Sequence, residues 1–119
     1  MSDEQSPTAE NIDEVPREDW PRWCAQTTSE QCGREVVLRQ SDRALGEVRL
    51  AAGQQLVAIE HDEFGKMEAL TIKCGSEAVP VSYVVAEPRS IRQQRDQAGV
   101  VHEVSIVDAT GRRTFVILG

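Results

Sequence analysis

The sequence predicts a mainly β fold of the α+β type, in which an N-terminal helix precedes about six or seven antiparallel strands. Short runs rich in β-branched residues, such as 104–107 and 115–118, recur at close spacing. Asp-x-x-Gly segments at 96–99 and 108–111, typical of type I turns, separate them. No helix-length connection lies between the runs, as a parallel sheet would require. We therefore expect a small bent sheet or a partly open barrel.

Charge divides the chain into a tail and one domain. The 119 residues carry a net charge of −7, and residues 1–19 alone hold seven acids against one arginine. Residues 1–14 have too little apolar surface to offset the entropy of ordering, which predicts a disordered acidic tail. Residues 15–119 form the predicted single domain. Its core should consist of Val, Ile, Leu and Ala, because aromatic residues make up only 4% of the chain.

Targeting signals and cysteine spacing both indicate a cytoplasmic protein. No apolar run approaches the 18 or so residues needed to span a membrane, and the acidic N-terminus does not resemble a signal peptide. Three cysteines without CxxC spacing fit reduced thiols. We expect Cys24 and Cys74 to be buried and inert, and Cys32, beside Gly33, to be accessible.

A helix is predicted from about Asp19 to Gly33. Residues 20, 23, 24 and 27 share one helical face, and Pro21 is tolerated only in the first turn. The expected role of Trp20 and Trp23 is to plug the open end of the sheet. The alternative is an exposed aromatic docking surface formed by these two residues.

The strands follow from alternation and from turn residues. We expect strands at 34–40, 47–50, 54–61, 66–74, 79–86, 100–107 and 115–118, of which 47–50 is short. Glu87-Pro88 should stop or bulge the strand at 79–86, and 91–95 should resume it. Ala-Ala-Gly at 51–53 should break the chain between two of them, and a third Asp-x-x-Gly turn is expected at 62–65. His61-Asp62-Glu63 is then a solvated hairpin tip, since no ligand at a suitable spacing supports metal binding there.

Several motifs resemble those of an uncharacterised family of small bacterial proteins, classed as a domain of unknown function. They are PRxxWxxW at 16–23, EALTI at 68–72, EPxxI at 87–91, VHEVSI at 101–106 and DATGRRTFV at 108–116. The resemblance covers about residues 15–118 and implies a Pro-Arg-x-x-Trp helix followed by a β-meander, but no activity and no catalytic residue. The chain departs from the family pattern at 89–95, where RSIRQQR stands in place of an acidic linker.

That departure creates a basic cluster near the end of the chain. Arg89, Arg92 and Arg95 lie on one predicted strand, and Arg112 and Arg113 begin the last one. Salt bridges to neighbouring strands on the solvent face would account for them. The alternative is nucleic-acid binding, because a helix before a small bent sheet is similar to the Sm-like barrel at the level of fold.

The residues indicate a non-enzymatic protein-interaction or self-associating domain, for instance a homodimer. No catalytic, metal-binding or cofactor-binding pattern occurs, and no phosphate-binding glycine motif is present. Val-rich strands with apolar residues on both faces predict that the domain binds a protein partner or a second copy of itself. We expect no binding to a membrane, and nucleic-acid binding is only the alternative. Two alternatives stay open: the Sm-like module that uses the arginine strand, and a small-ligand binder or enzyme with a pocket between helix and sheet.

Overall fold

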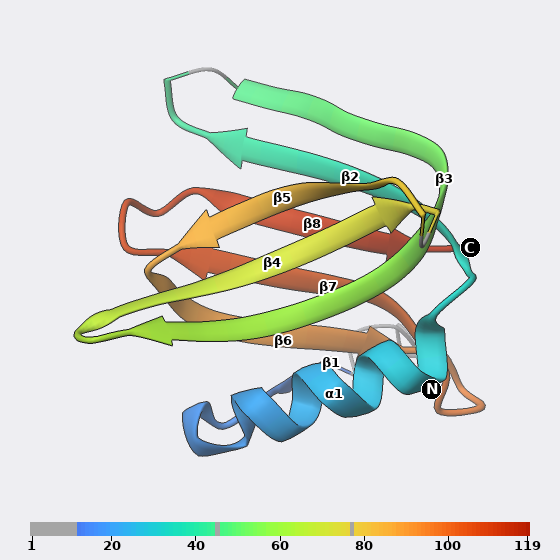
Figure 1. The fold of residues 1–119 in the computed structure, drawn as a ribbon, viewed down its shortest axis with the longest axis horizontal. Helices are drawn as coiled ribbons and strands as arrows, with labels where there is room; N and C mark the ends of the chain where they lie inside the picture. The colour runs from blue at the N-terminus through green and yellow to red at the C-terminus, as the bar shows by residue number, and fades with distance from the viewer. Residues whose placement is uncertain (1–11, 45, 77) are drawn as a thin grey trace, which may run out of the picture.

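One antiparallel sheet and one helix make up the fold in a computed structural model that describes residues 12–44, 46–76 and 78–119 (Figure 1). The described strands form an eight-stranded sheet in the order β1-β6-β7-β8-β2-β3-β4-β5, and the sheet does not close into a barrel. The predicted fold class is thereby confirmed. The elements are β1 (Ile12–Glu14), the 3-10 turn η3 (Arg17–Asp19), α1 (Trp20–Gln31), β2 (Glu35–Asp42), β3 (Gly46–Phe64), β4 (Met67–Gly75), β5 (Pro80–Ala86), β6 (Pro88–Arg95), β7 (Val101–Asp108) and β8 (Arg113–Leu118).

Strand β3 is long and bent, and it belongs to both halves of the sheet. Its first half pairs with β2 and its second half with β4. The predicted break at 51–53 is wrong, because the strand continues through it. Ala52 and Gly53 lie opposite Val37 alone, and Gly53 has a φ of +72°. A β-bulge therefore bends the strand at the glycine without ending it.

Two of the three predicted Asp-x-x-Gly turns are confirmed. The Oδ1 atoms of Asp96 and Asp108 each accept the backbone N–H two residues later, at 2.9 Å in both turns. The third, at 62–65, is wrong, since Asp62 lies within β3 opposite Ala69. Gly65 and the following lysine alone connect β3 to β4, so the hairpin tip lies farther along the chain than the sequence suggested.

Strand β1 adds one strand to the predicted number. The predicted disordered tail lies outside the described residues except for Ile12–Glu14, which pair with Arg92–Gln94 of β6. Val15 follows and donates its N–H to the carbonyl oxygen of Ile91 at 2.8 Å. Composition alone placed these residues in the tail, whereas pairing with a distant strand orders them.

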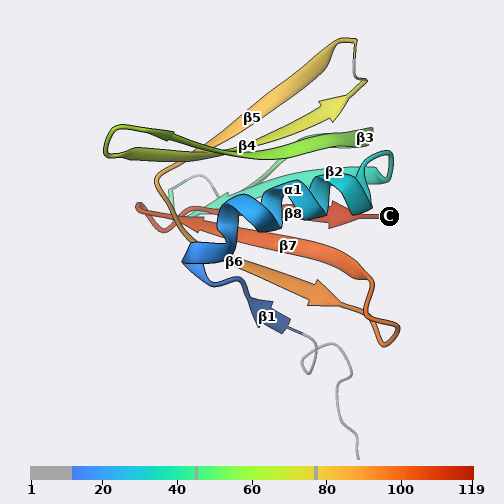
Figure 2. The ribbon, with the colours of Figure 1, turned by 60° about the horizontal axis from the view of Figure 1, so that its bottom comes forward.

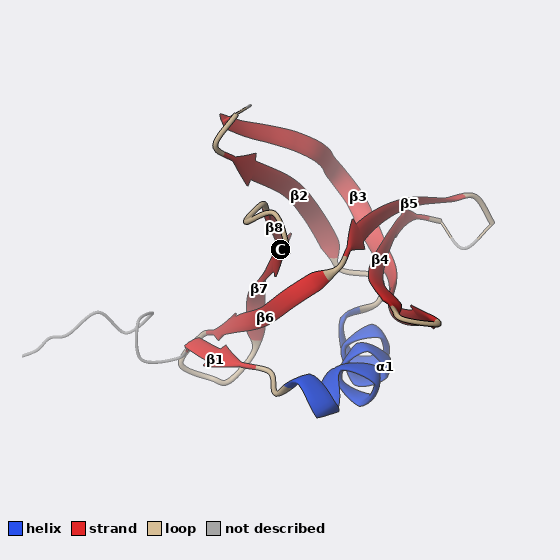
Figure 3. Ribbon diagram, turned by 90° about the vertical axis from the view of Figure 1, so that its left-hand side faces the viewer, coloured by secondary structure: helices blue, strands red, loops and turns tan. Residues whose placement is uncertain are grey.

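The sheet folds back on itself, so that β4, β5 and the second half of β3 lie over β6, β7, β8 and β2 (Figures 1 and 3). Buried apolar side chains from both layers form one core cluster, which includes Leu70 and Ile72 of β4 and Val104 and Ile106 of β7. Helix α1 lies across the open side between the β3–β4 hairpin and β6, and it packs mainly on β3 (Figure 2). The predicted position of the helix is confirmed to within two residues at each end.

Candidate interaction surface

Both tryptophans point into the protein. Trp20 and Trp23 are 1% and 8% exposed, so they form no docking surface. Their indole N–H groups are also engaged: Trp20 donates to the carbonyl oxygen of Val15, and Trp23 donates to Oε1 of Gln93, each at 3.1 Å. These two hydrogen bonds connect the helix to Val15, which precedes it, and to Gln93 of β6.

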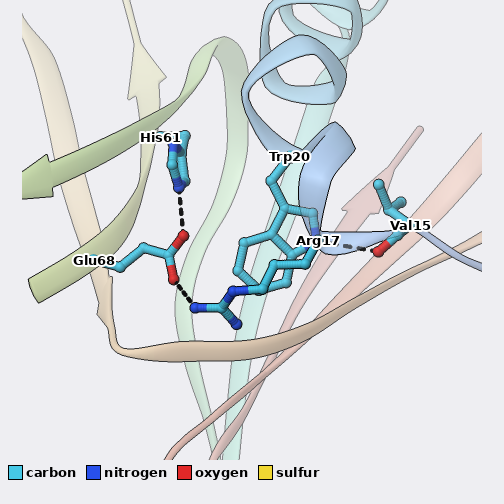
Figure 4. Close-up of polar contacts among 5 residues, drawn as sticks. All are labelled: Val15, Arg17, Trp20, His61 and Glu68. Carbon is cyan, nitrogen blue, oxygen red and sulfur yellow. Dashed lines mark hydrogen bonds and ion pairs between the residues drawn. The ribbon is translucent and has the colours of Figure 1, made fainter. Parts of the chain in front are cut away.

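A largely buried carboxylate lies where the helix meets the β3–β4 hairpin (Figure 4). Oε2 of Glu68 is 2.6 Å from Nε2 of His61, and Oε1 pairs with the guanidinium of Arg17. The side chains of His61 and Glu68 are 7% and 14% exposed. The Arg17 guanidinium lies over the ring of Trp20, with Cζ 4.7 Å from its centroid, and the imidazole meets the same ring edge to face. The expected solvated tip at 61–63 is therefore wrong for His61.

This cluster has a structural role. A histidine paired with a carboxylate can act as a general base, but here both carboxylate oxygens are occupied and the imidazole packs against an indole. Among the described residues, no three His, Cys, Asp or Glu side chains converge as a metal site would require. The cluster instead joins the 3-10 turn, the helix and the hairpin through one acid.

The cysteines occupy the positions that the sequence predicted. Cys24 and Cys74 are buried, and Cys32 is exposed. Burial, together with the negative charge of Asp62, raises the pKa of Cys24 from 9.0 to about 12. Burial alone raises the pKa of Cys74 from 9.0 to about 11. A thiol that stays protonated is a poor nucleophile, so neither buried cysteine is suited to covalent catalysis.

The structure does not bring the predicted arginines together as one free basic surface. Three of them pair with acids: Arg92 with Glu14 at 3.6 Å, Arg95 with Asp13 at 2.9 Å, and Arg112 with Asp42 at 3.3 Å. The first two acids belong to β1, within the predicted tail, which is why sequence reasoning missed them as partners. Arg89 and Arg113 are exposed on β6 and β8. Salt bridges between neighbouring strands, the first expectation for this cluster, account for Arg92 and Arg95.

The edge strand β5 is the surface that combines exposure with unused hydrogen-bonding capacity. It ends the sheet, and it pairs with β4 in unbroken register from Pro80 to Ala86. The N–H of Glu87, which follows the strand, donates to the carbonyl oxygen of Glu68 in β4 at 2.9 Å. Because N–H groups alternate in direction along a strand, those of Ser82 and Val84 point away from β4. Val84 also exposes 59% of its surface.

Fold and surface together define a small antiparallel β domain that a helix covers on one side and that leaves an edge strand open. The chain belongs to DUF5335, a family of unknown function, whose model matches residues 11–119. The expected membership of an uncharacterised family is thereby confirmed. No curated protein and no solved structure shows significant similarity to the chain. Within the described ranges, no helix has the length and apolar character needed to cross a membrane.

Proposed function

We propose that this domain is a non-enzymatic self-associating module, in which β5 pairs with β5 of a second copy. The observation that supports the proposal is the open edge: a strand of seven residues with no neighbour on its outer side among the described elements. An exposed strand edge is a template for pairing with another chain, and two such edges satisfy each other's backbone groups.

Edges that remain unpaired are commonly protected by charges, prolines or bulges. β5 contains no charged residue, it has no bulge against β4, and Pro80 stands only at its first position. The opposite edge of the sheet differs, since β1 has three residues and two of them are acids. The contrast identifies β5 as the edge that is available to a partner.

A second copy fits this edge better than a charged partner does. Two uncharged strands meet without repulsion, and a two-fold axis near Tyr83 would place Ser82 opposite Val84 of the other copy. Both residues direct their backbone groups outward, so each such pair would exchange two N–H···O bonds. The two acids of β1, Asp13 and Glu14, lie at the opposite end of the sheet order from β5, so they do not face the proposed contact.

The oligomeric state tests the proposal. Sedimentation velocity over a concentration series should show a species of twice the 13.2 kDa chain mass that gains population with concentration. A single species of the chain mass up to the solubility limit would overturn the proposal.

A further inference from the structure

A polar pocket of about 420 Å³ lies between α1 and the β6–β7 hairpin. The helix contributes Trp23, Thr27 and Gln31, and β6 contributes Gln93 and Arg95. Val100 and Val101 add apolar surface at the start of β7. The pocket lies apart from β5, so its role is independent of the proposed self-association.

The pocket gathers buried polar side chains. As whole residues, Thr27, Gln31 and Gln93 are 6%, 7% and 9% exposed, and Thr114 is the one other polar residue as deeply buried in the described ranges. Burying an amide costs free energy unless its donors and acceptors find partners. Three of these four buried polar residues line this one pocket, so their hydrogen-bonding partners decide what the pocket can bind.

Both glutamine amides have a fixed orientation. Nε1 of Trp23 donates to Oε1 of Gln93 at 3.1 Å, and Nη1 of Arg34 donates to Oε1 of Gln31 at 2.5 Å. Indole and guanidinium nitrogens can only donate, so each amide must turn its oxygen toward them and keep its NH₂ group for the other side.

The two NH₂ groups are unused. Neither Nε2 atom has a hydrogen-bond partner among the described residues. Both Nε2 atoms are accessible to solvent. In the described part of the chain, the fully buried side-chain atoms that lack a hydrogen-bond partner are Arg39 Nε and Gln54 Oε1, and neither glutamine Nε2 is among them. The pocket thus offers two pre-oriented neutral donors that only a ligand or water can satisfy.

The charges around the pocket cancel, which favours a neutral ligand. Arg95 pairs with Asp13 at 2.9 Å, and Glu30, which accepts from Gln26 at 3.1 Å, offsets Arg34, which donates to Gln31. A ligand with acceptors for the two amides and hydroxyl donors for Glu30 satisfies both groups. The indole of Trp23 and the valines suit a C–H face. We infer that the pocket binds a small neutral carbohydrate.

NMR titration of the full chain tests this inference. Glucose, galactose, N-acetylglucosamine and maltose are added in turn, and sodium acetate serves as the anionic comparison. At least one sugar should shift the side-chain NH₂ signals of Gln31 and Gln93 and the indole N–H of Trp23 in a saturable manner, whereas acetate should leave them in place. The absence of saturable shifts with all four sugars, or saturation by acetate alone, would overturn the inference.

Matched variants localise the binding. Gln93→Glu keeps an acceptor for Trp23 but removes the donor, and we expect it to weaken sugar binding about tenfold, the equivalent of one hydrogen bond. Gln94→Glu places the same charge on the next residue of the strand, outside the pocket, and should bind as the parent does. Gln31→Glu, which keeps an acceptor for Arg34, replaces Gln93→Glu if the latter fails to fold. Unchanged affinity in the folded donor-deleted variant contradicts the site.

Discussion

His61 and Glu68 meet diagonally across the β3–β4 hairpin, with Nε2 of the histidine 2.6 Å from Oε2 of the glutamate. Leu70 is the register partner of His61, so Glu68 lies two positions along β4, on the same face of the sheet. The second carboxylate oxygen pairs with Arg17, which precedes the helix. One acid therefore links the 3-10 turn that precedes the helix to the β3–β4 hairpin.

Replacing this acid should destabilise the fold. Glu68→Ala leaves a buried imidazole without its partner, and we expect it to lower the free energy of unfolding by about 1–3 kcal/mol in urea titrations. Glu60→Ala is the control, since Glu60 pairs with Lys73 at 3.1 Å on the surface, where a salt bridge contributes about 0–1 kcal/mol. An equal decrease in the free energy of unfolding in the two variants would show that the Glu68 cluster stabilises the fold no more than a surface salt bridge does.

Strand β1 should contribute to stability although it has only three residues. A chain that starts at Asn11 keeps the β1–β6 pairing, whereas one that starts at Pro16 loses it together with Val15. Val15 is buried, and its carbonyl oxygen accepts from the indole of Trp20. We expect the shorter chain to unfold at a clearly lower urea concentration. Coincident unfolding curves would mean that β1 forms without stabilising the domain.

The raised thiol pKa values predict selective labelling. At pH 8, iodoacetamide should modify the exposed Cys32 of the folded chain and leave Cys24 and Cys74 protonated and shielded, so mass spectrometry should find one label. The unfolded chain should take up three. Rapid labelling of a second site in the folded protein would contradict the assigned burial.

The raised pKa values of Cys24 and Cys74 also predict how the free energy of unfolding changes at alkaline pH. Above pH 9 these thiols ionise in the unfolded chain but stay protonated in the folded one, up to about pH 11 for Cys74 and 12 for Cys24. The unfolded state then binds fewer protons, so the free energy of unfolding falls as pH rises above 9. A Cys24→Ala/Cys74→Ala variant should lose this part of the pH dependence. An identical decline between pH 8 and 10 in both proteins would assign the effect to other groups.

Local patterns in the sequence allowed much of the fold to be predicted. The helix could be predicted from four residues at helical spacing. The turns at Asp96 and Asp108 could be predicted because each Asp side chain accepts a hydrogen bond from a backbone N–H two residues later. The failures have a common cause in longer-range structure. Gly53 permits a bulge and not a break because β2 supports the strand on one side. β1 forms because β6 provides backbone partners about 80 residues away.

The candidate surfaces were harder to predict. The valines of β5 were visible in the sequence, but the order of strands that leaves β5 at an edge was not. The pocket depends on Gln31 and Gln93, whose amide orientation follows from contacts with Arg34 and Trp23 that only the folded chain brings together. The acids that neutralise Arg92 and Arg95 were assigned to the tail because pairing with β6 leaves no trace in local composition.

The most direct test of the account is the mass of the particle in solution for the parent chain and two lysine variants. Val84→Lys places a charge on the β5 edge, and Met67→Lys places the same charge on a side chain of equal exposure, 60% against 59%, at the β3–β4 hairpin tip. We expect light scattering to show dimers for the parent and for Met67→Lys, and monomers for Val84→Lys. A dimer that survives Val84→Lys unchanged, or a monomeric parent, would contradict pairing through β5.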